Sequence, residues 1–254
     1  MLFALRLLPF LLLPTLGVAQ ESPININVGN DLLSSTRIFQ MITLLTFLSL
    51  APSLLMMVTS FTRIVVVFSF LRSAMGLQSS PPNTVLISLA LFLTIFIMGP
   101  TFNVAYENGI SPYLNKQIDE QTAFTETVAP FEKFMLRNVH NDDLTLFTNM
   151  LPAEERDEIT LVENPDGTRS IENIPLRSLI PAFIISELRR AFEIGFLIFL
   201  PFIVIDLTIA SILMSMGMMM LPPVMISLPF KIIFFVLVDG WRLLCGSLVE
   251  SFHV

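Results

Sequence analysis

The chain has 254 residues, of which 54% are hydrophobic and 14% are charged, and its mean hydropathy is +0.75. Water-soluble domains carry about 25% charged residues, so this composition excludes a soluble protein and indicates a membrane protein. The net charge of −7 also excludes the basic surface that nucleic-acid binding requires.

The first nineteen residues have the pattern of a cleaved secretory signal peptide. Arg6 precedes a short apolar core at residues 7–16, and Gly17 and Ala19 are the small residues that signal peptidase requires. We expect cleavage after Ala19 and a non-cytoplasmic segment over residues 20–37. The alternative is an uncleaved anchor helix.

Two uncharged runs predict a first helical hairpin over residues 38–106. Residues 38–62 and 84–105 carry no charge and are each long enough to cross a bilayer, which takes about 20 residues. The connection between them contains Arg63, Arg72 and a Ser-Ser-Pro-Pro-Asn breaker.

Residues 107–180 form an acidic insertion between the apolar parts of the chain. They include fourteen acidic residues and six basic ones, and apolar residues still recur at helical spacing. Residues 164–167, Asn-Pro-Asp-Gly, predict a turn. We therefore expect a small helical domain that faces water.

A second hairpin is predicted over residues 181–254, from apolar runs at about 191–221 and 224–249. Charged residues, prolines and glycines interrupt both runs: Pro201, Asp206, Gly217, Pro229, Lys231, Asp239 and Gly240. Kinks and charges persist at membrane depth where protein or a watery cavity shields them. We expect these helices to face neighbouring helices or subunits. The predicted fold is thus an all-α membrane protein with four apolar segments in two hairpins, the second of them broken.

The distribution of charge predicts the topology. The short connection with Arg63 and Arg72 contains no acidic residue, and such loops stay in the cytoplasm. The acidic domain and both termini are therefore expected in the periplasm.

Glu187 and Lys231 are charged residues in apolar surroundings. An unpaired charge there is costly, so we predict that the two form an ion pair, within one chain or between adjacent copies. The alternative is that both side chains extend to lipid headgroups.

Asp206 and Asp239 raise three possibilities. Two carboxylates sharing a proton would suggest an aspartyl protease, but neither local sequence resembles those enzymes. Carboxylates at depth also occur in proton relays. We favour a structural role as buried polar groups that hydrogen-bond helix ends.

Methionines crowd the connection between the last two apolar runs: Met214, Met216, Met218, Met219, Met220 and Met225. Methionine is flexible and polarisable, so such a loop in a pore could seal around chains of differing sequence. The alternative is ordinary packing against lipid or protein.

The sequence predicts neither catalysis nor a cofactor. It contains no phosphate loop, dinucleotide-binding glycine motif, Gly-x-Ser-x-Gly or His-Glu-x-x-His. Cys245 is the only cysteine, and the two histidines, His140 and His253, lie far apart in the sequence, so no metal site is expected.

Four stretches fix charged, aromatic, proline or glycine residues within generic apolar sequence: FTRIVVV at 61–67 with QSSPPN at 78–83, PAFIISEL at 181–188 with AFEIGF at 191–196, MMMLPP at 218–223, and PFK at 229–231 with DGW at 239–241. Together they resemble the FliP family of the flagellar type III protein export gate. This resemblance extends over nearly all of the mature chain except the acidic insertion.

The resemblance implies several copies in a ring with FliQ and FliR subunits, with FliO assisting assembly and FlhA and FlhB completing the gate. Unfolded flagellar subunits would pass through its channel. It also implies that Met218, Met219 and Met220 form a gasket, and that Glu187 and Lys231 are the family's characteristic acid and lysine. In related assemblies much of this core lies above the membrane plane.

Two other functions remain open. The corresponding subunit of a virulence type III secretion system shares these sequence features, although the signal peptide and long acidic loop favour the flagellar system. A proton-coupled transporter of small solutes, using Asp206 and Asp239, is an alternative of another class.

Overall fold

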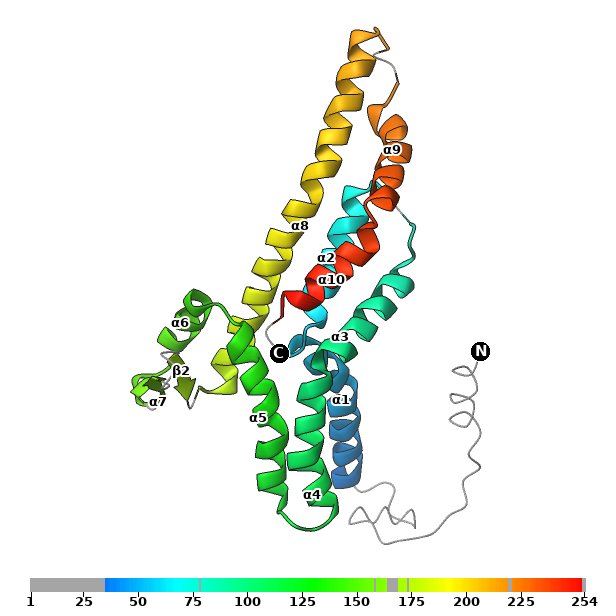
Figure 1. Ribbon diagram of the computed structural model, residues 1–254. Coiled ribbons are helices and arrows are strands. Elements are labelled where there is room, and N and C mark those ends of the chain that lie inside the picture. The colour runs from blue at the N-terminus through cyan, green and yellow to red at the C-terminus, as the bar shows by residue number, and fades with distance from the viewer. Residues whose placement is uncertain are drawn as a thin grey trace, which may run out of the picture. The chain divides into compact units, whose positions relative to one another are not determined.

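The computed structural model describes residues 35–77, 79–157, 159–163, 169–172, 174–218 and 221–252 (Figure 1). The chain divides into two compact units, Met1–Ser49 and Leu50–Val254. Helix α1 (Ser35–Met57) begins in the first unit and ends in the second. The predicted signal peptide lies outside the described residues.

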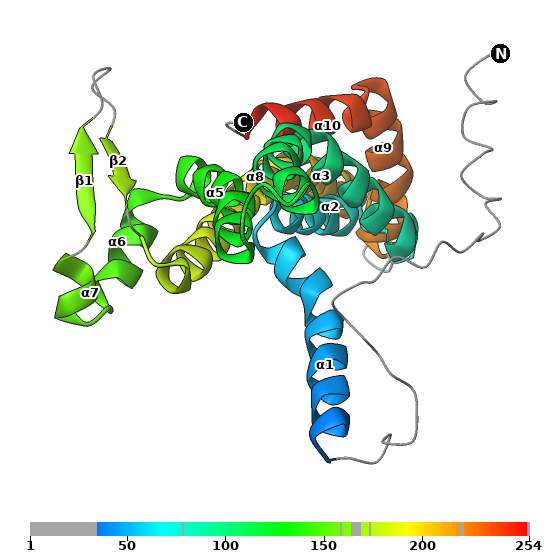
Figure 2. The ribbon, with the colours of Figure 1, turned by 90° about the horizontal axis from the view of Figure 1, so that it is seen from below.

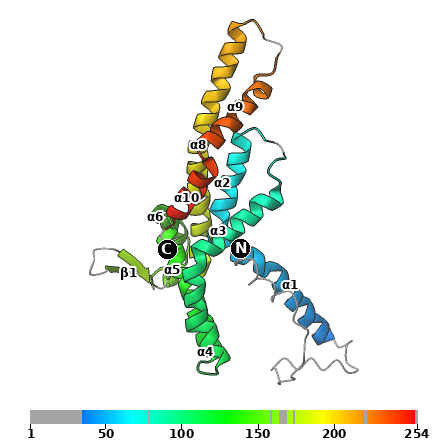
Figure 3. The same cartoon turned by 45° about the vertical axis from the view of Figure 1, so that its right-hand side comes forward.

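The apolar helices of the second unit pack around α8 (Leu176–Ser215), a single helix of 40 residues. Helix α2 lies along the middle of α8 and α9 along its second half, and α10 contacts α9 and α3 (Figures 1 and 3). These four helices have the bounds α2 (Phe61–Ala74), α3 (Asn83–Ala105), α9 (Pro223–Leu237) and α10 (Gly240–Glu250). Gly195 permits the close approach of α2 and α8, because a Cβ there would lie 2.5 Å from the ring of Phe70.

The connection predicted between the first two apolar runs contains α2, which packs inside the unit. Phe61, Ile64, Val67, Phe68 and Leu71 repeat at helical spacing and are buried. Arg63 shares this face and is completely buried. It is therefore not the solvent-facing loop cation that the topology argument assumed.

The acidic insertion is mainly helical, as predicted. It contains the π-helical turn η2 and four α-helices: η2 (Tyr106–Ile110), α4 (Ser111–Leu114), α5 (Glu120–Asn138), α6 (Asn141–Asn149) and α7 (Ala153–Asp157). Asp119 caps α5, since its carboxylate accepts hydrogen bonds from the Gln121 amide at 3.2 Å and the Thr122 hydroxyl at 2.6 Å. The Thr122 hydrogen bond lowers the pKa of Asp119.

A short β-hairpin is an addition to the predicted all-α fold. Strands β1 (Thr160–Glu163) and β2 (Arg169–Glu172) pair antiparallel, with Glu163 opposite Arg169 (Figure 2). The two strands have only four residues each, too few for a period-two pattern to stand out from the surrounding helical spacing. The predicted turn at 164–167 falls outside the described residues.

Two helical segments within the described parts of the chain are long and apolar enough to cross a membrane: Asn83–Leu114 and Leu176–Ser215. Helices α9 and α10 make a third if they are counted as one span bent by 62°. The first predicted run corresponds to α1, of which Phe39–Leu50 is a shorter apolar stretch. The structure thus contains two or three candidate spans where the sequence predicted four.

Candidate functional site

A buried ion pair joins α2 to α8. Arg63 and Glu187 are both 0% exposed, and they face each other across 124 residues of sequence. The Arg63 Nε donates to Glu187 Oε2 at 2.8 Å, and its Nη2 donates to Oε1. Two parallel bonds between a guanidinium and a carboxylate fix the relative position of the two helices.

The end of the described chain completes the surroundings of Arg63. Its Nη1 donates to the carbonyl and to the hydroxyl oxygen of Ser251, each at 2.9 Å. The Phe252 ring lies 3.7 Å from the guanidinium carbon. Arg63 therefore joins α2 to two other parts of the fold, α8 and the end of the described chain, and its buried charge has both an anion and polar acceptors.

A second ion pair lies further along α8. Lys231 of α9 is 4% exposed, and its Nζ donates to Asp206 Oδ2 at 2.6 Å and to the Ala74 carbonyl at 3.1 Å. The Ser227 hydroxyl donates to Asp206 Oδ1 at 2.6 Å. Because Ala74 ends α2, the ammonium group also neutralises the negative end of that helix.

These contacts correct the predicted Glu187–Lys231 pair within one chain. Both carboxylate oxygens of Glu187 accept bonds from Arg63, whereas Lys231 binds Asp206. Glu187 and Asp206 are separated by several turns of α8, so one lysine cannot serve both. Asp206 was predicted to be a buried group that hydrogen-bonds a helix end, but its side chain is 37% exposed and bonds to the side chains of Lys231 and Ser227.

A third polar cluster, which sequence reasoning missed, attaches α6 of the acidic domain to α8. Asp143 is buried; its Oδ2 accepts from the Ser186 hydroxyl at 2.8 Å and its Oδ1 from Arg189 Nη2 at 2.5 Å. The His140 amide donates to Ser186 Oγ at 2.9 Å. Ser186 and Glu187 are neighbours in sequence, so adjacent residues of α8 hold two different elements.

Asp239 is not the buried group that the sequence predicted. Its side chain is 66% exposed and lies 3.8 Å from Arg242, too far for more than a weak interaction. Asp239 occupies the break between α9 and α10 with φ of 53°, a left-handed conformation that aspartate tolerates better than most residues. Among the described residues, no group of three His, Cys, Asp or Glu side chains is placed to hold a metal ion.

The methionine-rich connection forms the tip of the α8–α9 hairpin (Figure 1). Gly217 ends α8 with φ of +75°, and the Met218 amide donates to the Leu213 carbonyl at 3.0 Å, as in a glycine C-cap. The described methionines here are exposed by 44% to 71%: Met214, Met216, Met218 and Met225. Met219 and Met220 lie outside the described residues.

The hairpin also exposes a large apolar surface along its length. Val204 and Leu207 of α8 are each 62% exposed, and Leu237 of α9 is 80% exposed. An apolar groove runs between the two helices, lined by Val204, Ile205, Thr208, Ile209, Phe230, Ile233, Phe234 and Leu237. Apolar surface of this extent belongs against lipid or other protein chains.

Comparison of the amino-acid sequence with known proteins gives the family of the chain. A sequence model of the FliP family matches residues 44–248. Flagellar biosynthetic protein FliP of Caulobacter vibrioides is 54% identical over 242 residues, which are 95% of this chain and 86% of that protein. The FliP proteins of Agrobacterium fabrum and Bacillus subtilis are 49% and 48% identical, over 99% and 90% of this chain and 99% and 98% of their own lengths. The chain therefore belongs to the FliP family.

Proposed function

We propose that this protein is a non-enzymatic subunit of the flagellar type III protein export gate in the bacterial inner membrane. Several copies assemble into a ring with FliQ and FliR at the flagellar basal body, with the acidic domain in the periplasm. Unfolded flagellar subunits pass through the channel that the ring encloses. FliO assists assembly, and FlhA and FlhB complete the gate.

The exposed apolar face of the α8–α9 hairpin is the observation that carries this proposal. This face consists of exposed apolar residues from both helices: Leu197, Leu200, Val204, Leu207, Ile233, Val236 and Leu237. The same helices also hold the buried or half-buried polar residues Ser227, Lys231 and Asp206. A single helical hairpin surrounded by lipid does not need polar side chains such as these. In a hairpin packed among neighbouring subunits, their ion pair and hydrogen bond fix the positions of the two helices.

The exposed methionines at the tip support a role in closing the channel. Their side chains are flexible, and Gly217 turns the chain back so that several of them lie at one end of the hairpin. Copies arranged around an axis would bring these ends together into a gasket of Met218, Met219 and Met220.

The mass of the complex extracted in mild detergent tests the assembly. We expect several copies of this chain together with FliQ and FliR, and loss of swimming when the gene is deleted. A stable monomer with full export activity would contradict the proposal.

Replacing Met218, Met219 and Met220 together with alanine tests the gasket. We expect the membrane to leak ions or export to fall. Met150→Ala is the matched control, because Met150 is 69% exposed in the acidic domain, away from the hairpin tip. Normal export with an unchanged ion barrier in the triple variant would remove the gasket role and leave the subunit assignment intact.

The transporter alternative is tested through Asp206 and Asp239. Asp206 is already bound to Lys231 and Ser227, so its carboxylate is committed to structural contacts. Asp206→Asn with Asp239→Asn would favour the transporter if protein export persisted while uptake of a solute was lost.

A further inference from the structure

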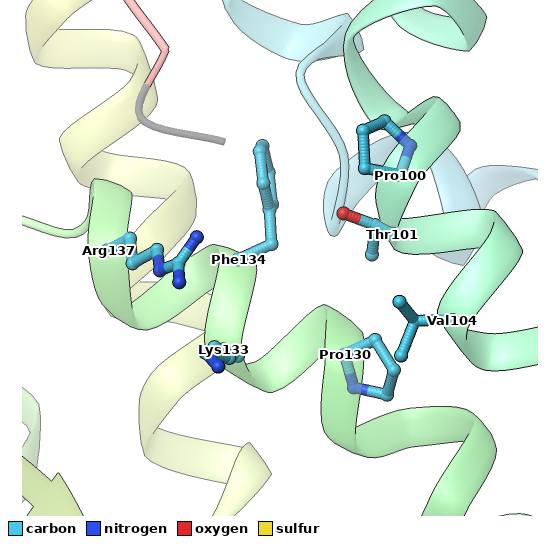
Figure 4. Close-up of a pocket in the computed structure, with 7 residues that line it drawn as sticks. All are labelled: Pro100, Thr101, Val104, Pro130, Lys133, Phe134 and Arg137. Carbon is cyan, nitrogen blue, oxygen red and sulfur yellow. The ribbon is translucent and has the colours of Figure 1, made fainter. Parts of the chain in front are cut away.

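A cleft between α3 and α5 combines an apolar lining with two basic side chains (Figure 4). Pro100 and Val104 of α3 line one side, and Pro130 and Phe134 of α5 line the other. Thr101 of α3 and the basic residues Lys133 and Arg137, one turn apart on α5, complete the lining. The volume is about 220 Å³, several times the roughly 30 Å³ that one water molecule occupies.

Lys133 and Arg137 are two basic residues that lie together at the cleft in an otherwise acidic domain. Both are exposed, and neither forms a hydrogen bond or an ion pair with any described residue. Nearby arginines behave differently, since Arg177 binds Glu155 and Arg189 binds Asp143. The two charges at this cleft are thus available to an anion from outside the chain.

The position of the cleft along α3 indicates where that anion comes from. Helix α3 has 23 residues and no charged side chain, so it is about 35 Å long, close to the hydrocarbon thickness of a bilayer. The candidate span continues beyond α3 to Leu114, but its uncharged part ends before Glu107. Pro100 and Val104 therefore lie within about two turns of the first charged residue, where a span meets the lipid headgroups. Phe92 and Phe96, at 72% and 71% exposure, provide a lipid-facing surface on the same helix.

We propose that this cleft is a binding site for an anionic phospholipid. The phosphate lies between Lys133 and Arg137, and the glycerol and upper acyl chain lie along Pro100, Val104, Pro130 and Phe134. Basic residues beside a membrane-spanning helix attract such headgroups electrostatically, and the apolar lining favours a lipid over a free anion.

The test compares phosphatidylglycerol with phosphatidylcholine on the full-length chain, with retained lipid counted by native mass spectrometry. The wild-type protein is expected to retain phosphatidylglycerol preferentially. Lys133→Gln with Arg137→Gln should weaken that retention about ten- to thirtyfold, since each basic residue contributes about 1 kcal/mol near an anionic surface. Lys116→Gln with Arg156→Gln removes the same charge from the same domain and should leave retention unchanged.

A second variant tests the apolar side of the cleft. Val104 is 44% exposed, so Val104→Asp leaves the core intact while placing a carboxylate where the lipid would lie. We expect a comparable loss of phosphatidylglycerol with unchanged helical content by circular dichroism.

Four results would overturn the proposal. They are equal retention of both lipids by the wild-type protein, equal loss in the control pair, displacement of the lipid by an equal concentration of inorganic phosphate, and loss of subunit association in the Lys133 and Arg137 variant. The last result would assign the two cations to acidic residues of a neighbouring copy.

Discussion

Both halves of α8 are rich in apolar residues, but their surroundings differ. In the first half, Leu179 and Phe183 are 1% and 0% exposed, packed against α2 and the acidic domain. In the second half, Val204 and Leu207 are each 62% exposed. An apolar composition thus indicates that a helix must bury its side chains. Only the fold shows which of those side chains are buried by the same chain.

The charged residues of the two halves differ in the same way. Glu187 and its partner Arg63 are both fully buried, and the chain itself supplies every contact. Asp206 is 37% exposed although its partner Lys231 is buried. The Glu187 ion pair is therefore complete within one chain, whereas the Asp206 pair lies beside an open face of α8.

The largest expected effect comes from removing one member of the fully buried pair. Glu187→Ala leaves the Arg63 charge buried without an anion, and we expect the free energy of unfolding to fall by about 3–5 kcal/mol. Denaturant unfolding in detergent micelles measures this change.

The exposed pair Arg177–Glu155 provides the control for that measurement. Glu155→Ala should lower stability by less than about 1 kcal/mol, because water solvates both partners. The double variant Arg63→Met with Glu187→Leu should lower the free energy of unfolding by less than Glu187→Ala alone does. An equal or greater loss in the double variant would mean that burial of the charge is not the cause.

Breaking the pair in the second half should cost less. Lys231→Met leaves the Ala74 carbonyl and the Asp206 carboxylate without the ammonium group, but Asp206 remains in contact with solvent. We expect a loss of about 2 kcal/mol by the same assay. A loss as large as that of Glu187→Ala would show that the second half is as fully enclosed as the first.

The boundary between the halves is tested at Gly195. Gly195→Ala places a Cβ against the Phe70 ring, and we expect a loss of about 1–3 kcal/mol as α2 and α8 are pushed apart. Gly99→Ala is the control, since a Cβ there meets nothing within 4 Å and helix propensity favours alanine by about 1 kcal/mol. Stabilisation by both substitutions would contradict the close contact.

The smallest expected change in stability is at the hairpin tip. Met218→Ala should alter the free energy of unfolding by less than about 0.5 kcal/mol, because the side chain is exposed within the single chain. The measurement is thermal unfolding of the chain separated from its complex. A loss above 1 kcal/mol would mean that Met218 packs inside its own subunit.

The apolar helices were predictable because long uncharged runs leave few alternatives. The runs at 38–62 and 84–105 correspond to α1 and α3, and the broken later runs correspond to α8, α9 and α10. The acidic insertion was predicted to be helical from its spacing. Helix α2 was missed because it carries two arginines, and a charge does not reveal from sequence alone whether it faces water.

The ion pairs were predictable in kind but not in partner. Glu187 and Lys231 were identified as charges that require counterions, but Glu187 pairs with Arg63 and Lys231 pairs with Asp206. Arg63 and Glu187 are 124 positions apart, and a single sequence does not show which distant residues the helix packing brings together. The Asp143 cluster left no recognisable pattern, since its members are ordinary surface residue types.

The length of α8 has a mechanical consequence. From its anchor at Glu187 to its last residue, Ser215, the helix extends about 40 Å without interruption. A tilt of about 5° at the anchor would displace the far end by about 3–4 Å over that length. Small changes in the angle of α8 beside the acidic domain would therefore move the tip of the α8–α9 hairpin by several ångströms.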